Sequence, residues 1–162
     1  MSLEELRKKI DSLDEKLVEL INQRAQVVKE VGKLKTTSDK TLPIYAPDRE
    51  KAVFEKIALH NKGPMPDKAL GAIWREIMSG SFFLERPLCI AYLGPQGSFS
   101  HNAAILKFGQ SVDYEAMADI RAIFEEVSKG HSDFGIVPIE NSAGGGVRES
   151  RDAFVETDVL IC

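Results

Sequence analysis

The first 35 residues carry two rows of apolar side chains, each repeating every seven residues. This spacing is typical of a long helix that packs along another helix. Ser2 and Glu5 form a capping-box signature, so we expect the helix to begin at Leu3 and to run to about residue 35–38. Because about 50 Å of helix exceeds the width of a small domain, we expect its partner to come from a second copy of the chain. The rows comprise Leu3, Ile10, Leu17 and Val31, and Leu6, Leu13, Leu20, Val27 and Leu34.

Two further helices are expected before residue 87. Residues 36–47 are rich in Thr, Ser, Asp, Lys and Pro and predict a loop. Pro47 suits the first turn of a second helix, which Gly63-Pro64 ends. A third helix is expected from Asp67 to the residues before Arg86-Pro87. Residues 1–86 therefore predict an all-α unit of three helices.

The pattern changes at Leu88, where short apolar runs begin to alternate with helical segments. Such alternation is typical of a parallel α/β sheet. Gly144–Gly146 is expected to be a flexible turn. The pattern leaves only three or four strands in residues 88–162, so we interpret this part as an incomplete α/β domain. The expected strands cover 88–93, 112–117, 134–139 and 159–161, and the expected helices cover 100–108, 119–129 and a segment from residue 148.

Composition and charge exclude several classes of protein. The chain has 162 residues, 43% of them apolar and 28% charged, which is ordinary globular composition. A net charge of −4 argues against a general nucleic-acid-binding surface. No apolar run is long enough to span a bilayer, and the acidic, amphipathic N-terminus does not resemble a signal peptide. Cys89 and Cys162 form no metal-ligand pattern, so we expect no metal, no cofactor and a cytoplasmic protein.

A cation interrupts the first apolar row. Arg24 takes the place of an apolar residue between Leu17 and Val31, and an unpaired buried guanidinium would cost several kcal/mol. A salt bridge or a head group that reaches solvent would also satisfy it. Lys35 lies only about 20° away around the helix, and two cations on one face suit a carboxylate or phosphate. Arg7, roughly 100° off that face, either lies in solvent or serves the site of a partner chain.

Polar residues also interrupt the expected second and third helices. Ser81 and Glu85 are four residues apart on an otherwise apolar stripe, where a protonated carboxyl group could donate a hydrogen bond to a neutral oxygen. A helix-end charge near the linker is the alternative for Glu85. Arg49 and Glu50 open the second helix, and a solvated first turn would explain them equally well.

Several stretches of the chain resemble those of known protein families. The stretch LRKKIDSLDEKLVELINQRAQVVKEVGKLK (6–35), together with Pro47–Glu50 and IMSGSFFLERP (77–87), resembles the all-helical chorismate mutases. AYLGPQGSFSHNAA (91–104) and GIVPIENSAGGGV (135–147) resemble the two N-terminal motifs of prephenate dehydratases. Their order is that of the bifunctional chorismate mutase/prephenate dehydratases, or P-proteins.

The resemblance implies an intertwined homodimer, joined through the long N-terminal helix, with two mutase sites that bind chorismate. Arg24 and the Arg7 of the other chain would hold the two carboxylates, and Lys35 and Glu85 would donate to the ether oxygen. Glu85 must be protonated to do so, which implies weaker activity at high pH. Ala46 stands where some members have an acidic residue. The remaining implied contacts are Arg49 on the carboxylate side, Glu50 on the ring hydroxyl and Ser81 on the ring-side carboxylate.

Residues 88–162 resemble the first part of a dehydratase with periplasmic-binding-protein-like lobes. Its cleft, which would take prephenate, would be lined by Gly94–Ser98 and Glu140–Ser142, and in particular by Gly97, Ser98, Asn141 and Ser142. The family's catalytic Thr-Arg-Phe motif and regulatory ACT domain do not occur in this sequence. We therefore expect no dehydration of prephenate. His101 is expected to face solvent or to cap a helix.

Two other functions compete with an active mutase. One is a non-catalytic helical dimerisation module joined to a ligand-binding fragment. It does not explain why Arg24, Lys35, Ser81 and Glu85 occur on apolar faces. The other is a relative that removes pyruvate from isochorismate, which the helical fold permits but the dehydratase-like motifs do not favour.

Overall fold

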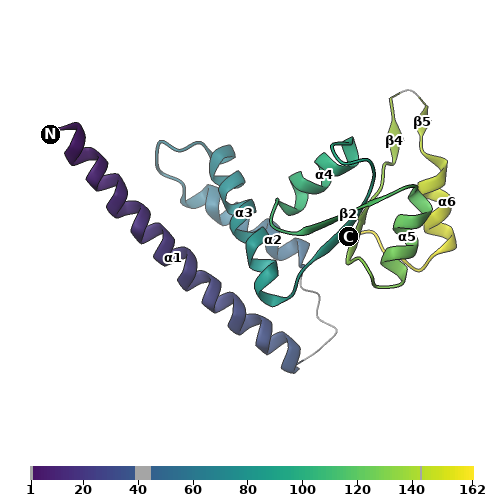
Figure 1. The fold of residues 1–162 in the computed structure, drawn as a ribbon, viewed down its shortest axis with the longest axis horizontal. Coiled ribbons are helices and arrows are strands. Elements are labelled where there is room, and N and C mark those ends of the chain that lie inside the picture. The colour runs from purple at the N-terminus through teal and green to yellow at the C-terminus, as the bar shows by residue number, and fades with distance from the viewer. Residues whose placement is uncertain (1, 39–44, 143) are drawn as a thin grey trace. The chain divides into compact units, whose positions relative to one another are not determined.

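The computed structural model describes residues 2–38, 45–142 and 144–162. The chain divides into two compact units, residues 1–44 and residues 45–162. The described part of the first unit is one long helix, α1 (Leu3–Ser38), drawn in purple to blue in Figure 1. Ser2 and Glu5 form the expected capping box: the Glu5 N–H donates to Ser2 Oγ at 3.2 Å and the Ser2 N–H to Glu5 Oε2 at 2.7 Å. The expected start and end of this helix are confirmed.

The loop expected at 36–47 is confirmed only in part. Residues 36–38 belong to α1, and residues 39–44 lie outside the described residues. The apolar rows of α1 are exposed, from 42% of the side-chain surface at Leu6 to 66% at Leu34. Within the described residues, the rows whose spacing predicts helix packing are therefore left uncovered.

The second unit begins with the two other expected helices, α2 (Pro47–His60) and α3 (Asp67–Glu85). Pro47 occupies the first turn of α2, and the chain is extended at Arg86, just before Pro87, because a residue before proline disfavours the helical region. The remaining elements are β1 (Cys89–Leu93), α4 (Phe99–Phe108), β2 (Asp113–Met117), α5 (Ile120–Ser128), β3 (Phe134–Ile136), β4 (Glu140–Asn141), β5 (Gly145–Gly146) and α6 (Arg148–Glu156).

The expected parallel sheet is confirmed. Its strand order is β2-β1-β3, and both pairs are parallel, with Tyr92 of β1 opposite Ala116 and Ile136. The central strand is buried, with Ile90, Ala91 and Tyr92 at most 3% exposed. This burial explains why β1 is a continuous apolar run rather than an alternating one.

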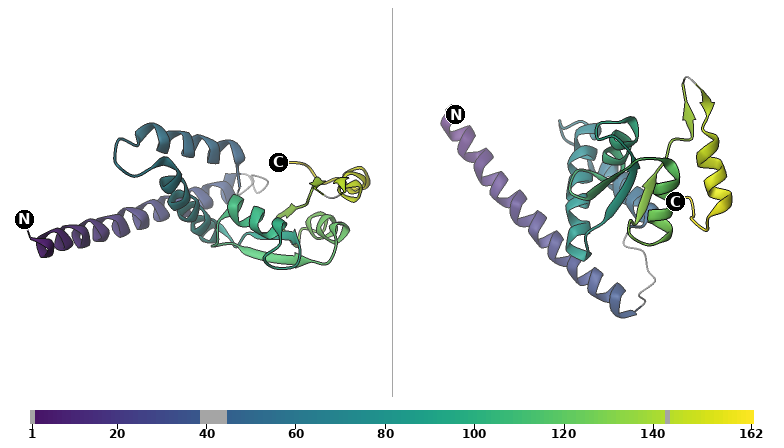
Figure 2. Two further views of the ribbon diagram at one scale, coloured as in Figure 1. Left: turned by 90° about the horizontal axis from the view of Figure 1, so that it is seen from above. Right: turned by 45° about the vertical axis from the view of Figure 1, so that its right-hand side comes forward.

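Two expectations for the last 30 residues are wrong, and a third holds only in part. β3 ends at Ile136 instead of residue 139, because Pro138 has no N–H for a strand ladder. Residues 159–161 form no strand, and Leu160 and Ile161 are exposed. Of the expected turn at Gly144–Gly146, Gly144 does lie in a turn. Gly145 and Gly146 instead pair with β4 in a short antiparallel hairpin, which extends away from the sheet in Figures 1 and 2.

The core of the second unit joins the helices to the sheet. Tyr45, just before α2, is 4% exposed. Its ring lies 5.9 Å from that of Phe82 in α3, 5.2 Å from Phe108 in α4 and 5.3 Å from Phe134 in β3. Buried aromatic pairs at these separations stabilise packing beyond their area, so α2 and α3 are held on the α/β part of the chain.

Polar contacts fix α3 on the loop that follows α4. The Glu76 carboxylate accepts the Gln110 N–H, at 3.0 and 3.1 Å from its two oxygens, and Ser79 Oγ accepts the Ser111 N–H at 3.0 Å. Gly109 has a φ of 81°, and a Cβ there would lie 2.6 Å from Ser79 Cβ. Glycine is therefore required where the loop meets the helix.

Candidate functional site

The three cationic residues of the first unit that were predicted to bind the substrate, Arg7, Arg24 and Lys35, all lie on α1. Arg24 and Lys35 are partly exposed, whereas Arg7 is fully on the surface. Because residues 24 to 35 are continuous helix, the geometry of an α-helix places Arg24 and Lys35 about 20° apart around its axis. The two cations can therefore approach one anionic ligand from one helix.

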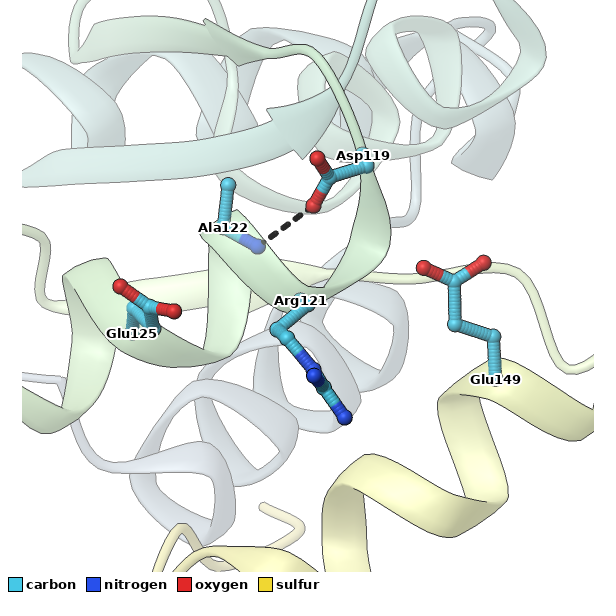
Figure 3. A pocket seen from close by; sticks show the side chains of 5 residues that line it. All are labelled: Asp119, Arg121, Ala122, Glu125 and Glu149. Atoms are coloured by element: carbon cyan, nitrogen blue, oxygen red, sulfur yellow. Dashed lines mark hydrogen bonds between the residues drawn. The ribbon is translucent and has the colours of Figure 1, made fainter.

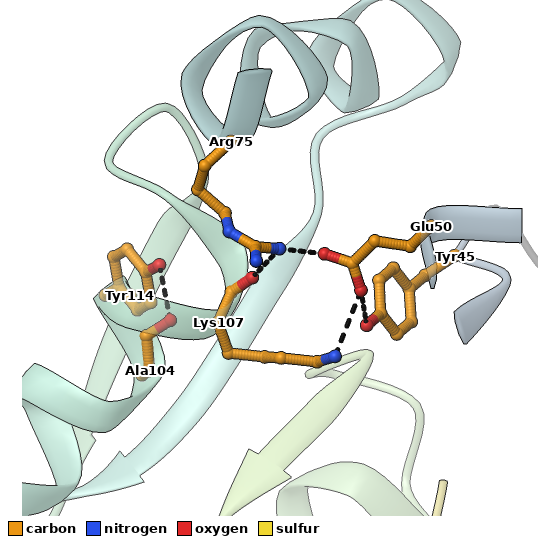
Figure 4. Close-up of polar contacts among 6 residues, drawn as sticks. All are labelled: Tyr45, Glu50, Arg75, Ala104, Lys107 and Tyr114. Atoms are coloured by element: carbon orange, nitrogen blue, oxygen red, sulfur yellow. Dashed lines mark hydrogen bonds and ion pairs between the residues drawn. The ribbon is translucent and has the colours of Figure 1, made fainter. Parts of the chain in front are cut away.

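The best-defined polar cluster of the second unit is centred on Glu50, in the first turn of α2. Its side chain is only 11% exposed. One carboxylate oxygen accepts from Arg75 of α3, and the other accepts from Tyr45 and, at 3.0 Å, from Lys107 of α4, as Figure 4 shows. A nearly buried carboxylate is stabilised only with such partners, so this cluster ties α2, α3 and α4 together.

Arg75 is itself held on three sides. Its guanidinium lies 4.4 Å from the centre of the Phe54 ring and donates to the Lys107 carbonyl at 2.9 Å. Burial lowers the pKa of Arg75, and the negative groups nearby oppose this shift. The side chain nevertheless stays charged, and it therefore acts as a fixed cation beside Glu50.

Three other residues of the second unit were predicted to bind chorismate: Arg49, Ser81 and Glu85. Arg49 is exposed, and Glu85 at the end of α3 is partly exposed. The Ser81 hydroxyl donates to the Ile77 carbonyl at 2.6 Å, one helical turn earlier. To donate to a ligand, Ser81 must therefore turn its hydroxyl hydrogen away from Ile77.

Sequence reasoning missed Tyr45, Arg75 and Lys107. Arg75 and Lys107 lie 25 and 57 residues from Glu50 along the chain, and no periodicity links such distant positions. The burial of Tyr45 could have been predicted from one sequence feature: an aromatic residue just before a helix start can pack on the core.

The first dehydratase-like loop follows β1. The Ser98 side chain caps α4, accepting the His101 N–H at 3.2 Å, and donates to the Leu93 carbonyl at 2.8 Å. The Gly97 N–H donates to His101 Nδ1 at 3.0 Å. The His101 ring stacks on Tyr92 with ring centres 4.6 Å apart. His101 thus has a local structural role, and both predicted cleft residues here are engaged in shaping the loop.

The second dehydratase-like loop follows β3, the strand beside β1. The carboxyl ends of parallel neighbours meet at one edge of a sheet, so the segments after Leu93 and Ile136 lie at the same edge. Asn141 belongs to β4, in the hairpin that extends away from this edge, and both Asn141 and Ser142 are exposed. The topology therefore brings the two predicted loops to one edge.

Among the cavities that the described residues form, two lie in the second unit. One, of about 460 Å³, is lined by Asp119, Arg121, Ala122, Glu125 and Glu149 (Figure 3). Its single cation, Arg121, also pairs with Glu156 at 2.7 Å, so the cavity disfavours anionic ligands. The other, of about 1020 Å³, has a mostly apolar lining beside β3 and the C-terminal segment. The two cations that line this second cavity, Lys107 and Lys129, are paired with Glu50 at 3.0 Å and with Glu125 at 2.9 Å.

The described residues show neither a metal site nor a membrane span. Over residues 2–38, 45–142 and 144–162, no group of three His, Cys, Asp or Glu side chains is placed to hold a metal ion. None of the helices in that part of the chain has the length and apolarity needed to cross a membrane.

Comparison with known families assigns both parts of the chain. The model of type II chorismate mutases matches residues 6–86, which contain α1, α2 and α3. The chain belongs to this family. The model of prephenate dehydratases matches residues 90–162, which contain the parallel sheet and α4 to α6. The predicted resemblance to the bifunctional family is confirmed.

Relatives from several bacteria match nearly the whole chain. Proteins named bifunctional chorismate mutase/prephenate dehydratase are 45% identical in Stutzerimonas stutzeri, 44% in Aquifex aeolicus and 32% in Escherichia coli. The alignments cover 99%, 98% and 96% of this chain but only 45%, 44% and 44% of those proteins. The chain therefore spans less than half the length of these relatives.

Solved structures of chorismate mutase from Thermus thermophilus are also similar to part of this chain. The structure titled Form II is 32% identical and covers 51% of this chain and 92% of its own, with a TM-score of 0.48. The structure titled Form I gives a TM-score of 0.46.

Proposed function

We propose that this chain catalyses the rearrangement of chorismate to prephenate. The observation that carries the proposal is the match of residues 6–86 to type II chorismate mutases, within which Arg24 and Lys35 share one face of α1. Because chorismate has two carboxylates, cations on a common face suit it as a ligand. The mutase part is assigned to residues 1–86 and the dehydratase-like part to residues 88–162.

The reaction breaks one C–O bond while one C–C bond forms, within a single molecule. Catalysis then requires that the substrate be held in its compact conformer and that developing charge on the ether oxygen be stabilised. Lys35 and a protonated Glu85 would donate to that oxygen. Arg24 would bind a carboxylate, and Glu50 would accept from the ring hydroxyl. The remaining proposed contacts are the Arg7 of a second copy, Arg49 and Ser81.

We infer that two copies pair along α1. Exposed apolar rows on a helix of 36 residues support this, because an isolated helix with such a face is only marginally stable in water. Pairing would also supply the Arg7 of the second copy, which lies away from the face that carries Arg24.

We infer that the second half is a dehydratase-like lobe related to periplasmic binding proteins, with prephenate as its ligand. The two loops at one edge of the sheet support this location of the cleft. The family's Thr-Arg-Phe motif is not in the sequence, so no conversion of prephenate to phenylpyruvate is expected from this chain. Two unpaired cysteines, Cys89 and Cys162, support a cytoplasmic location.

The direct test is the loss of chorismate absorbance on addition of the purified chain. Samples are assayed for phenylpyruvate before and after acid treatment, which converts prephenate to phenylpyruvate. Chorismate loss with phenylpyruvate only after acid supports the mutase and the inactive second half. Phenylpyruvate before acid contradicts the expectation for the second half. No chorismate loss refutes the proposed function and favours a dimerisation module.

Arg24→Leu sharpens this test. Removing a cation that stabilises the bound anion is expected to lower turnover by about 100-fold or more. The dimer is expected to stay as stable or to become more stable, because the buried charge is replaced by an apolar side chain. Lys29→Leu is the matched control: Lys29 is exposed on the same helix, about 140° around from Arg24. An Arg24→Leu chain that unfolds would show that Arg24 is structural.

A further inference from the structure

The Glu50 carboxylate uses most of its capacity to accept hydrogen bonds. A carboxylate has about four lone-pair positions, and Tyr45, Arg75 and Lys107 donate to three. About one position therefore remains for a further donor, such as a ligand hydroxyl. Two of the three donors are cations, which keep the group ionised and able to accept.

Lys107 contributes to this cluster twice. Its ammonium group lies 3.0 Å from Glu50 Oε2 and 5.4 Å from the centre of the Tyr45 ring. Its backbone carbonyl accepts from Arg75, the other cation on Glu50, as Figure 4 shows. Lys107 therefore orients Glu50 both directly and through Arg75.

Lys107 does not belong to the mutase part of the chain. It lies in the last turn of α4, within residues 90–162 that match prephenate dehydratases, whereas Glu50 and Arg75 lie within residues 6–86 that match chorismate mutases. A side chain of the second half thus completes the surroundings of a mutase residue of the first half.

We propose that Lys107 is a positioning residue for the mutase reaction, through which the dehydratase-like half holds Glu50 ready to accept from the ring hydroxyl of chorismate. The inference rests on the proposed function and adds a role for the second half in the chemistry of the first. The hydroxyl is not a reacting group, so its contact with Glu50 is the same in the ground state and the transition state. Its loss therefore raises KM and leaves kcat nearly unchanged.

The test compares steady-state chorismate loss by the full chain and its variants. Lys107→Met keeps the apolar stem and removes the charge, and is expected to raise KM about tenfold with kcat within about twofold. Lys107→Arg keeps a cation and is expected to restore KM to within about threefold. The matched control is Lys129→Met at the C-cap of α5, because Lys129 is also paired with a glutamate at 2.9 Å, is 54% exposed and lies in the same half of the chain. It is expected to leave both constants unchanged.

A double-mutant cycle separates positioning from a merely structural role. Glu50→Gln is expected to raise KM by itself, and adding Lys107→Met should then change KM by less than about twofold, because the residue through which Lys107 acts is already altered. If Lys107→Met does not fold, Lys107→Gln replaces it in the same cycle, since it removes the charge but can still donate.

The outcomes distinguish this inference from the proposed function. A KM for Lys107→Met equal to that of the unmodified chain overturns the positioning role. A full additional KM effect of Lys107→Met in the Glu50→Gln background does so as well. If the unmodified chain consumes no chorismate, the proposed function itself fails and this inference with it.

Discussion

The contact between α3 and the loop after α4 gives a sharp stability prediction at Gly109. Alanine there would have to adopt a φ near 81°, a conformation that disfavours a side chain by about 1–3 kcal/mol. Its Cβ would also lie 2.6 Å from Ser79 Cβ. Ser79 is fully buried on a helix, so the overlap cannot relax cheaply and adds about 1–3 kcal/mol. We therefore expect Gly109→Ala to lower the free energy of unfolding by about 2–6 kcal/mol.

Gly130 is the matched control for this change. It follows α5 with a φ of 73°, and a Cβ there would meet no atom within 4 Å. Gly130→Ala therefore carries the backbone strain alone, about 1–3 kcal/mol. Urea unfolding followed by circular dichroism gives both free energies. The difference between the two variants measures how firmly α3 is held on the α4–β2 loop.

The reasoning fails if Gly109→Ala unfolds at the same urea concentration as Gly130→Ala. In that case backbone strain alone would account for the loss of stability, and overlap with Ser79 would contribute nothing. A second test adds Ser79→Gly to Gly109→Ala, which removes the overlapping side chain. The double variant should then be less destabilised than the sum of the two single changes.

Two further predictions concern the α/β part. Burial raises the pKa of Tyr114 to about 12, with a smaller contribution from Glu76, so the unfolded chain ionises at a lower pH than the folded one. Below about pH 10, Tyr114 does not change the free energy of unfolding. Between about pH 10 and 12 that free energy falls by about 1 kcal/mol, after allowance for solvent screening. In Tyr114→Phe, the urea concentration at the unfolding midpoint should depend less on pH over this range. Ser98→Ala removes both the cap of α4 and the bond to the Leu93 carbonyl, and should cost about 1–2 kcal/mol in the same unfolding assay, whereas no loss would mean that water replaces the cap.

Local signals in the sequence predicted the helices well. The capping box at Ser2, the proline at the start of α2 and the proline after α3 each act within a few residues, so their effects on the backbone could be inferred directly. The parallel sheet was also predictable, because alternating strands and helices allow few arrangements. These features locate Arg24, Lys35, Glu50, Ser81 and Glu85 on their elements.

Contacts between distant segments could not be predicted in this way. Glu50 was expected to be free for a substrate, yet its carboxylate is held by residues 25 and 57 positions further along. Similarly, Gly97 was expected to line a cleft for prephenate, but its N–H donates to His101 Nδ1. Both outcomes depend on which groups tertiary packing brings together.

The exposed apolar rows of α1 have a consequence for any assay of this protein. If the helix gains its partner from a second copy, as proposed, its folding is a second-order process and depends on protein concentration. The fraction of chains with a complete site would then fall on dilution. Specific activity should decline at low enzyme concentration, and the rate should fall with time after a concentrated stock is diluted into substrate, as pairs dissociate. An enzyme concentration series is therefore also a measurement of the pairing equilibrium of α1.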